Sequence, residues 1–237
     1  YHSPVPQMLI TPLPKNLIDA IADAGIDLDD AAREAGIDRE ALESGVTFAE
    51  AGRFIGVAWR RLDDPAFGLR AGCVLRPERY GISGLTAMAS PTFGVALQRK
   101  ARYNRLVWGD TYRIRQDAKE FTVAAEAPDE SKPLGYSKVD MEFASLLTFG
   151  RRFASAAMAP IKVALRRPRP SFVALYEQIF RCPIAFAQPI NSISFSQADA
   201  LRPLISADHR AAQWLEFGAR AALEQMDDSS ITPRVRA

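Results

Sequence analysis

The amino-acid sequence predicts an α+β fold, in which an N-terminal helical part is followed by a small, mostly antiparallel sheet with packed helices. Up to residue 108, apolar residues recur at the 3.6-residue spacing of amphipathic helices. After Gly109 the period changes to two, the alternation of half-buried strands. The strands and helices that follow alternate too irregularly for a doubly wound sheet, and the strands are too few to predict a barrel.

The composition of the 237-residue chain is that of a globular protein, with 48% hydrophobic and 24% charged residues. The 30 Lys and Arg residues nearly balance the 28 Asp and Glu residues, and a net charge of +2 is small for a dedicated nucleic-acid-binding domain. Two cysteines, Cys73 and Cys182, exclude a disulfide framework and indicate a reducing compartment. No apolar run approaches the ~20 residues that span a bilayer, and no signal-peptide pattern opens the chain. We therefore expect a cytoplasmic protein with no membrane partner.

Helices are predicted for the N-terminal part of the chain. Their expected ranges are 15–24, 28–35, 38–42 and 47–62. Gly25 and Gly36 follow the first two, as glycines commonly do at helix ends. Thr47 and Glu50 have the spacing of a capping box at the start of the fourth. Its predicted buried face comprises Phe48, Ala51, Ile55, Ala58, Trp59 and Leu62.

Further helices are predicted up to residue 108. Asp64 is expected to cap a helix with Pro65 at its first position, ending at Gly72. Across the helix expected at 80–89, a face that another backbone can approach closely is formed by Gly81, Gly84, Leu85 and Met88. A long helix is expected at 92–108. Its predicted inward residues are Phe93, Ala96, Leu97 and Tyr103 or Asn104, and its polar side carries Gln98, Arg99, Arg102 and Arg105.

The second half of the chain is predicted to hold the sheet. Residues 111–115 and 120–124 are expected to form a hairpin around 117–119. Residues 127–135 are interpreted as a polar, mobile loop placed where a lid could sit. A helix over 139–157 follows, with Val139, Phe143, Leu146, Leu147 and Phe153 on its buried face. The remaining expected elements are strands at 161–165, 183–186 and 192–195 and helices at 172–180 and 207–226.

The sequence contains no recognisable catalytic or cofactor-binding pattern. His2 and His209 lack partners at the spacing of a metal or haem site. The two cysteines have no neighbouring histidine that would mark a nucleophile, and packed, inert thiols are the favoured interpretation. Gly81 and Gly84 lack both the preceding strand and the third glycine of a dinucleotide fingerprint. We therefore predict no enzyme, no metal and no cofactor.

Two arginine clusters have alternative interpretations. The run 166–170 could bind phosphate, carboxylate or DNA, but its two prolines favour a solvated turn that ends strand pairing. Arg99, Arg102 and Arg105 share a helical face that could attract an anionic ligand, and a solvated face is again favoured.

Aromatic residues gather near the transition from helices to hairpin. By default such side chains belong to the core, but small-molecule pockets are also lined by aromatic residues with a few polar groups. The candidate ligand-binding residues are Tyr80, Arg99, Tyr103, Trp108 and Tyr112.

A longer set of motifs resembles a known family. The motif residues are Gly68, Gly72, Gly81, Gly84, Pro91, Thr92, Ala96, Leu97, Pro168, Pro170, Tyr176, Cys182, Pro183, Phe186, Pro203 and Leu204. In combination, from about Leu17 to Trp214, they resemble the N-terminal, arabinose-binding-type regulatory domain of AraC/XylS-type bacterial transcription regulators. The sequence departs from the family pattern at Arg166 or Arg167, where a His is common, and at Phe93, where a Leu is usual.

The resemblance implies a regulatory domain that binds a small effector and forms a homodimer. The implied division is an N-terminal extension (1–14), an effector-binding domain (15–226) and a linker (227–237) to an absent C-terminal helix-turn-helix domain. DNA would be a partner only through that absent domain. The effector is expected between the glycine-containing helices and the sheet, with the last helix passing on the change.

The dimer interface is expected on the exposed side of the 139–157 helix or on the last helix, where Trp214 and Phe217 are candidates. The alternative interpretation is a protein-interaction or dimerisation domain without a ligand.

Overall fold

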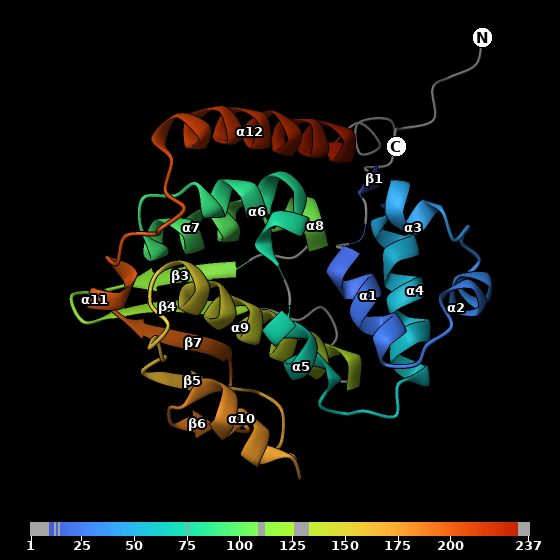
Figure 1. The fold of residues 1–237 in the computed structure, drawn as a ribbon, viewed down its shortest axis with the longest axis horizontal. Coiled ribbons are helices and arrows are strands. Elements are labelled where there is room, and N and C mark those ends of the chain that lie inside the picture. Colours follow the sequence, from blue (N-terminus) through green and yellow to red (C-terminus); the bar gives the residue numbers. More distant parts are fainter. Residues whose placement is uncertain are drawn as a thin grey trace.

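The computed structural model describes residues 10–11, 13, 15–74, 76–108, 112–125 and 133–231. Figure 1 shows a group of N-terminal helices beside a sheet that carries helix α9 (Pro133–Phe153) on one face, and helix α12 (His209–Ile231) lying across α6 (Gly81–Met88). Helices and a mostly antiparallel sheet together confirm the predicted α+β class.

The N-terminal helices have a core of their own. Its elements are β1 (Ile10–Thr11), α1 (Lys15–Asp23), α2 (Leu28–Ala35), α3 (Ala41–Ser44), β2 (Val46–Thr47) and α4 (Phe48–Arg61). Gly36 ends α2 with a φ of 68°, the left-handed conformation that favours glycine. Thr47 and Glu50 form the predicted capping box. The helices predicted here are thus confirmed, except that the one expected over 38–42 begins only at Ala41 and ends at Ser44. The short pairing of β1 with β2 was not predicted.

The predicted buried face of α4 is wrong in part. Phe54 and Val57, absent from the prediction, are buried, whereas Ile55 and Trp59 are half-buried. The apolar residues of α4 extend around more of the helix than one stripe. Contact with α2 therefore decides which of them faces the core.

Helix α5 (Phe67–Val74) joins the two halves of the molecule by packing along α9. A Cβ on Gly68 or Gly72 would collide with the backbone carbonyl of Ser137 or Met141, so these glycines allow the two helices to touch. The predicted start of α5 at Pro65 is wrong. Asp64 instead accepts a hydrogen bond from the Ala66 N–H in a turn that precedes the helix.

Gly81 and Gly84 do not form the shared face that was predicted for them, and each has a different role. Gly81 has a φ of 58° where the 3₁₀ turn Pro77–Arg79 ends, and a Cβ there would meet nothing within 4 Å. Gly84 lies against the carbonyl of Pro77. The close approach is therefore to the preceding turn of the same chain, and Leu85 is exposed.

The helix predicted over 92–108 is interrupted. Thr92 caps α7 (Phe93–Tyr103), and after Asn104 the chain continues as α8 (Arg105–Trp108). The predicted inward residues of this stretch are all buried.

The five-stranded sheet has the order β3-β4-β7-β5-β6. Its strands are β3 (Tyr112–Gln116), β4 (Glu120–Ala125), β7 (Asn191–Ser196), β5 (Lys162–Ala164) and β6 (Ile184–Ala185). All neighbours pair antiparallel except β5 with β6. The predicted hairpin is β3–β4, and its turn is stabilised by Asp117, which accepts hydrogen bonds from the N–H groups of Lys119 and Glu120.

Helix α9 is the centre of the larger core and differs from its prediction at both ends. It begins at Pro133, so the last residues of the expected 127–135 loop are helical, and residues 126–132 lie outside the described part of the chain. It ends at Phe153 rather than at residue 157. Residues 139–147 are buried without interruption, so the exposed side proposed for dimerisation does not exist there.

Short elements complete the fold. Helices α10 (Val173–Phe180) and α11 (Gln197–Ala200) precede α12, which continues through 227–231, where a linker was expected. Within the described residues, no helix is long and apolar enough to cross a bilayer.

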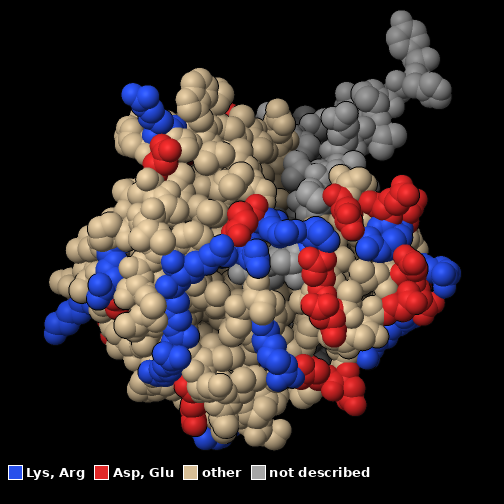
Figure 2. All heavy atoms as spheres, viewed as in Figure 1, with Lys and Arg blue, Asp and Glu red and all other residues tan. Residues whose placement is uncertain are grey.

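Charges on the face in Figure 2 are mixed. Acidic side chains gather over the N-terminal helices, where arginines of α4 pair with acids of α2, such as Arg61 with Asp30. Basic side chains form a band across the middle of the same face (Figure 2).

Candidate functional site

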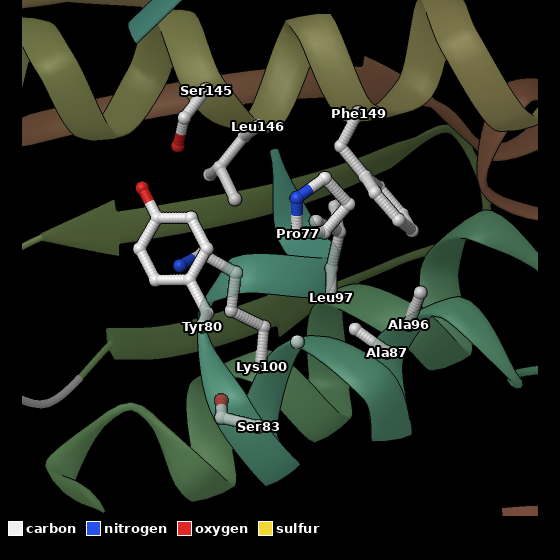
Figure 3. Close-up of a pocket in the computed structure, with 11 residues that line it drawn as sticks. Pro77, Tyr80, Ser83, Ala87, Ala96, Leu97, Lys100, Ser145, Leu146 and Phe149 are labelled. Atoms are coloured by element: carbon white, nitrogen blue, oxygen red, sulfur yellow. The ribbon is translucent and has the colours of Figure 1, made fainter. Parts of the chain in front are cut away.

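A small cavity lies between α6, α7 and α9. Its volume is about 40 Å³, and its lining residues are Pro77, Tyr80, Ser83, Gly84, Ala87, Ala96, Leu97, Lys100, Ser145, Leu146 and Phe149 (Figure 3). Such a volume holds water molecules or one small chemical group. Pockets for whole metabolites are typically about 300–1,000 Å³, so a larger ligand requires α6 or α7 to move away from α9.

A lysine and a glutamate meet at one end of this cavity. The Nζ of Lys100 on α7 lies 3.5 Å from the Oε2 of Glu142 on α9. Glu142 is one helical turn before the lining residues Ser145 and Leu146, so it shares their face of the helix. The Glu142 side chain is 6% exposed and that of Lys100 is 18% exposed, so the pair is largely removed from water.

Two tyrosine rings flank the Lys100 ammonium. The Nζ lies 5.2 Å from the ring centroid of Tyr80 and 5.6 Å from that of Tyr112, within the range of cation–π attraction. Figure 3 shows the Lys100 nitrogen beside the Tyr80 ring. The Tyr112 hydroxyl donates a hydrogen bond to Glu142 Oε2. Lys100 therefore sits in a cage of two rings and one carboxylate.

Burial shapes the electrostatics of the cage. Burial raises the pKa of Tyr80 well above its usual value, and the nearby Glu142 carboxylate raises it further, so the phenol remains neutral. The Oε1 of Glu142 is buried and accepts no hydrogen bond from the described residues. A buried carboxylate oxygen without a donor is unfavourable, so the cage has an unfilled acceptor position.

The five candidate ligand-binding residues do not share one place. Tyr80 lines the cavity and Tyr112 contacts the same lysine. Tyr103 is fully buried in a separate cluster that includes Ala219 of α12. The side chain of Trp108 lies outside the described residues.

Arg99, the fifth candidate, binds α12. Its Nη2 lies 2.8 Å from Glu216 Oε2 and its Nη1 lies 3.0 Å from Ser90 Oγ. Arg102 and Arg220 also approach Glu216, at 3.3 and 3.1 Å. Partial burial acts to raise the pKa of Glu216, but hydrogen bonds from Arg220 and Arg99 outweigh it and lower the pKa. The solvated face predicted for these arginines is therefore wrong for Arg99, which is only 16% exposed and attaches α7 to α12. Arg102 also reaches Glu216 but is 56% exposed, and Arg105 lies on α8.

The predicted solvated turn at 166–170 is also wrong in part. Arg167 is only 11% exposed and donates hydrogen bonds to the carboxylate of Asp140 and, at 2.6 Å, to Tyr176 Oη. Tyr176 in turn donates to Asp140 Oδ1 at 2.6 Å. Arg167 therefore connects the turn to α9 and α10 from inside the protein.

The cysteines differ from their prediction in burial. Cys73 is exposed and Cys182 is half-buried, so neither is fully packed. Partial burial raises the pKa of both thiols, that of Cys182 to about 11, so both are protonated near neutral pH. In the described part of the chain, no group of three or more His, Cys, Asp or Glu side chains is placed to hold a metal ion.

Sequence reasoning missed Lys100 and Glu142. A signal was present for Glu142, because it stands within the apolar run Val139–Leu147, where a carboxylate needs a partner. Lys100 lies one turn after the inward residues Ala96 and Leu97, which gives the position of its stem but not of its charge.

Comparisons with known proteins agree with this fold. Residues 25–204 match the family described as "Arabinose-binding domain of AraC transcription regulator, N-term". The chain is 26% identical over 230 residues to the ornithine utilization regulator of Pseudomonas aeruginosa, covering 93% of this chain and 66% of that regulator. It also resembles the crystal structure of the transcriptional regulator CdpR from the same species, with a TM-score of 0.67 and 18% identity over 91% of this chain and 64% of that one. The chain thus spans about two thirds of each relative's length.

Proposed function

Since the chain belongs to the family of N-terminal arabinose-binding domains of AraC transcription regulators, we propose that it senses a small metabolite and controls DNA binding by another part of the same regulator. The family is one of transcription regulators and not of enzymes. The DNA reader would be a helix-turn-helix domain outside this chain. The regulator would work in the cytoplasm with no membrane partner.

The observation that carries this proposal is the position of α12. It rests on α6 and α7, two of the helices that line the cavity, and Arg99 of α7 holds its Glu216. A ligand that enters the cavity has to shift α6 or α7, because the space is small. Any such shift is transmitted to α12, and the ligand acts through its different affinities for the two arrangements.

The coupling has a direct test. Glu216→Ala removes the carboxylate that Arg99 and Arg102 share, so effector binding to the full-length regulator should remain while its effect on promoter binding falls. Glu224→Ala, an exposed glutamate of the same helix, is the matched control and should behave as wild type. Unchanged coupling in the Glu216 variant would contradict this route.

A screen tests sensing itself. A ligand that binds the folded state raises stability by about 2.7 kcal/mol at a hundredfold excess over its Kd. We expect one chemical class among amino acids, polyamines, sugars, fatty acids and aromatic acids to raise the melting temperature with dose.

We also propose that the chain forms a homodimer through α12. Trp214 and Phe217, three residues apart on one face, are 78% and 73% exposed, which is unusual for such large apolar side chains. Sedimentation should show a dimer that Trp214→Lys dissociates, and a wild-type monomer at micromolar concentration would oppose this.

The second candidate function is an interaction or dimerisation domain without a ligand. The small cavity and the exposed pair on α12 favour it. If no ligand in the screen raised the melting temperature of a folded, dimeric protein, this second function would be favoured over sensing.

A further inference from the structure

We propose that the effector is a primary amine, whose ammonium group binds Glu142 between the rings of Tyr80 and Tyr112, where the ammonium of Lys100 lies. This inference rests on the sensing function proposed above and names the chemical class of its ligand. Lys100 would then be an internal occupant that a ligand has to displace.

The cage has the chemistry of an ammonium site. Aromatic faces attract cations, and a buried carboxylate supplies the opposite charge. Nζ of Lys100 lies 5.2 and 5.6 Å from the two ring centroids and 3.5 Å from Glu142 Oε2. A carboxylate or phosphate ligand placed there would be repelled by Glu142, so the site selects a cation.

The internal occupant leaves the carboxylate incompletely bonded. Lys100 approaches Oε2, which already accepts the Tyr112 hydroxyl, while Oε1 is buried without a donor among the described residues. An ammonium group on a free ligand is not attached to α7. It can move closer to the carboxylate and donate to Oε1, which the Lys100 stem does not do here.

The rest of the cavity has the apolar character that suits a carbon chain, but at about 40 Å³ it admits one only if α6 or α7 moves away from α9. Beyond the cage its walls are apolar except for the hydroxyls of Ser83 and Ser145, and they carry no charge. The ligand class is therefore an amine carried on methylene groups, such as an alkylamine, a diamine or an amino acid with a side-chain ammonium group.

The charged end of the Lys100 side chain can leave the cage. The side chain is 18% exposed, and its four-carbon stem allows the charged end to reach water while the stem stays on the protein. The next residue towards the N-terminus, Arg99, holds Glu216 of α12. Exchange of the occupant therefore takes place next to the contact that joins α7 to α12.

Chemical complementation tests the site. Lys100→Ala empties the cage by removing three carbons and the nitrogen, and n-butylamine supplies these with one carbon more. The measurement is the melting temperature of the purified chain against amine concentration, with n-butanol and butyrate as uncharged and anionic analogues and with ionic strength held constant.

We expect n-butylamine to stabilise Lys100→Ala with a Kd at least about tenfold lower than for wild type, because no internal occupant competes. The analogues should have no such effect, and Lys100→Ala with Glu142→Gln should lose the gain. Lys162→Ala is the matched control, since it removes a lysine from an exposed ion pair with Glu120. Equal stabilisation by n-butanol, or none by any amine, would overturn the proposal.

Lys100→Met is a second variant, to be used if Lys100→Ala does not fold. It keeps an unbranched stem of similar length but lacks the charge, so methylammonium should stabilise it while tetramethylammonium, which lacks N–H donors, should not. Equal effects of the two ions would overturn the proposal.

The outcome separates this inference from the function on which it rests. If the screen finds only sugars or acids as ligands, sensing stands and the amine class is wrong. If no ligand of any class stabilises the wild type but n-butylamine still stabilises Lys100→Ala, the cage binds ammonium groups and the proposed sensing function is wrong.

Discussion

Helix α9 carries two buried carboxylates, two residues apart, that bind their cations in different ways. Both oxygens of Asp140 accept hydrogen bonds, from Tyr176 and from Arg167. Glu142 has one bonded oxygen and one without a described donor, and its lysine is 3.5 Å away. The carboxylate of the first pair is fully hydrogen-bonded and serves the fold, although the Arg167 Nε is buried without an acceptor among the described residues. The second is incomplete, and its cation sits on a flexible stem that can be exchanged for another.

The largest expected effect comes from breaking the Asp140–Arg167 pair. Asp140→Ala leaves Arg167 buried without its carboxylate, and such losses typically cost about 3–5 kcal/mol of unfolding free energy. Urea denaturation measures this. As a control, Glu120→Ala breaks the exposed pair with Lys162 and should cost less than about 1 kcal/mol. Similar losses in the two variants would show that the Arg167 site contributes no more than a surface pair.

A smaller loss of unfolding free energy is expected from separating α5 and α9. Gly72 lies against the carbonyl of Met141, the residue between the two acids, so Gly72→Ala should push α5 away from α9 at a cost of about 1–3 kcal/mol. Gly52→Ala in α4 meets nothing within 4 Å and should be neutral or stabilising. If Gly72→Ala were as stable as wild type, the close approach of α5 would not be what positions the acids.

The pH dependence of stability should report on Asp140, the more deeply buried of the two acids. Burial raises the pKa of Asp140 to about 6 from its ordinary 3.8, although Arg167 and Tyr176 act in the opposite direction. The folded carboxyl therefore binds its proton more tightly than the unfolded one. The resulting contribution is fully present below about pH 4 and is lost as pH rises through about 6.

Each unit of that pKa difference corresponds to about 1.4 kcal/mol. Relative to Asp140→Asn, wild type should lose unfolding free energy between pH 4 and 6 and then stay level, as measured by urea denaturation at each pH. A difference between the two proteins that does not change over this range would contradict the raised pKa.

The smallest effect is expected at the incomplete pair. Glu142→Gln keeps an acceptor for the Tyr112 hydroxyl, and Lys100 can turn to water, so the loss should stay below about 1 kcal/mol. The same denaturation experiment compares it with Asp140→Asn. A loss as large as that of Asp140→Asn would mean that both pairs are structural, which would also weaken the case for an exchangeable site.

Much of the fold could be predicted because its signals are local. The Thr47–Glu50 box, the glycine after α2 and the change of period after residue 109 each act within a few residues. The candidate site was only partly predicted. Tyr80 and Tyr112 were named, and their shared contact with Lys100 was not.

The sequence by itself therefore determined most of the elements, their order and the family resemblance, since periodicity, caps and turn residues need only neighbours along the chain. The tertiary structure alone decided which charges are buried and with what. Arg167 meets Asp140 across 27 residues and Arg99 meets Glu216 across 117. A basic side chain in an amphipathic pattern is expected in solvent until a carboxylate from a distant segment compensates its burial, and only packing brings that partner to it.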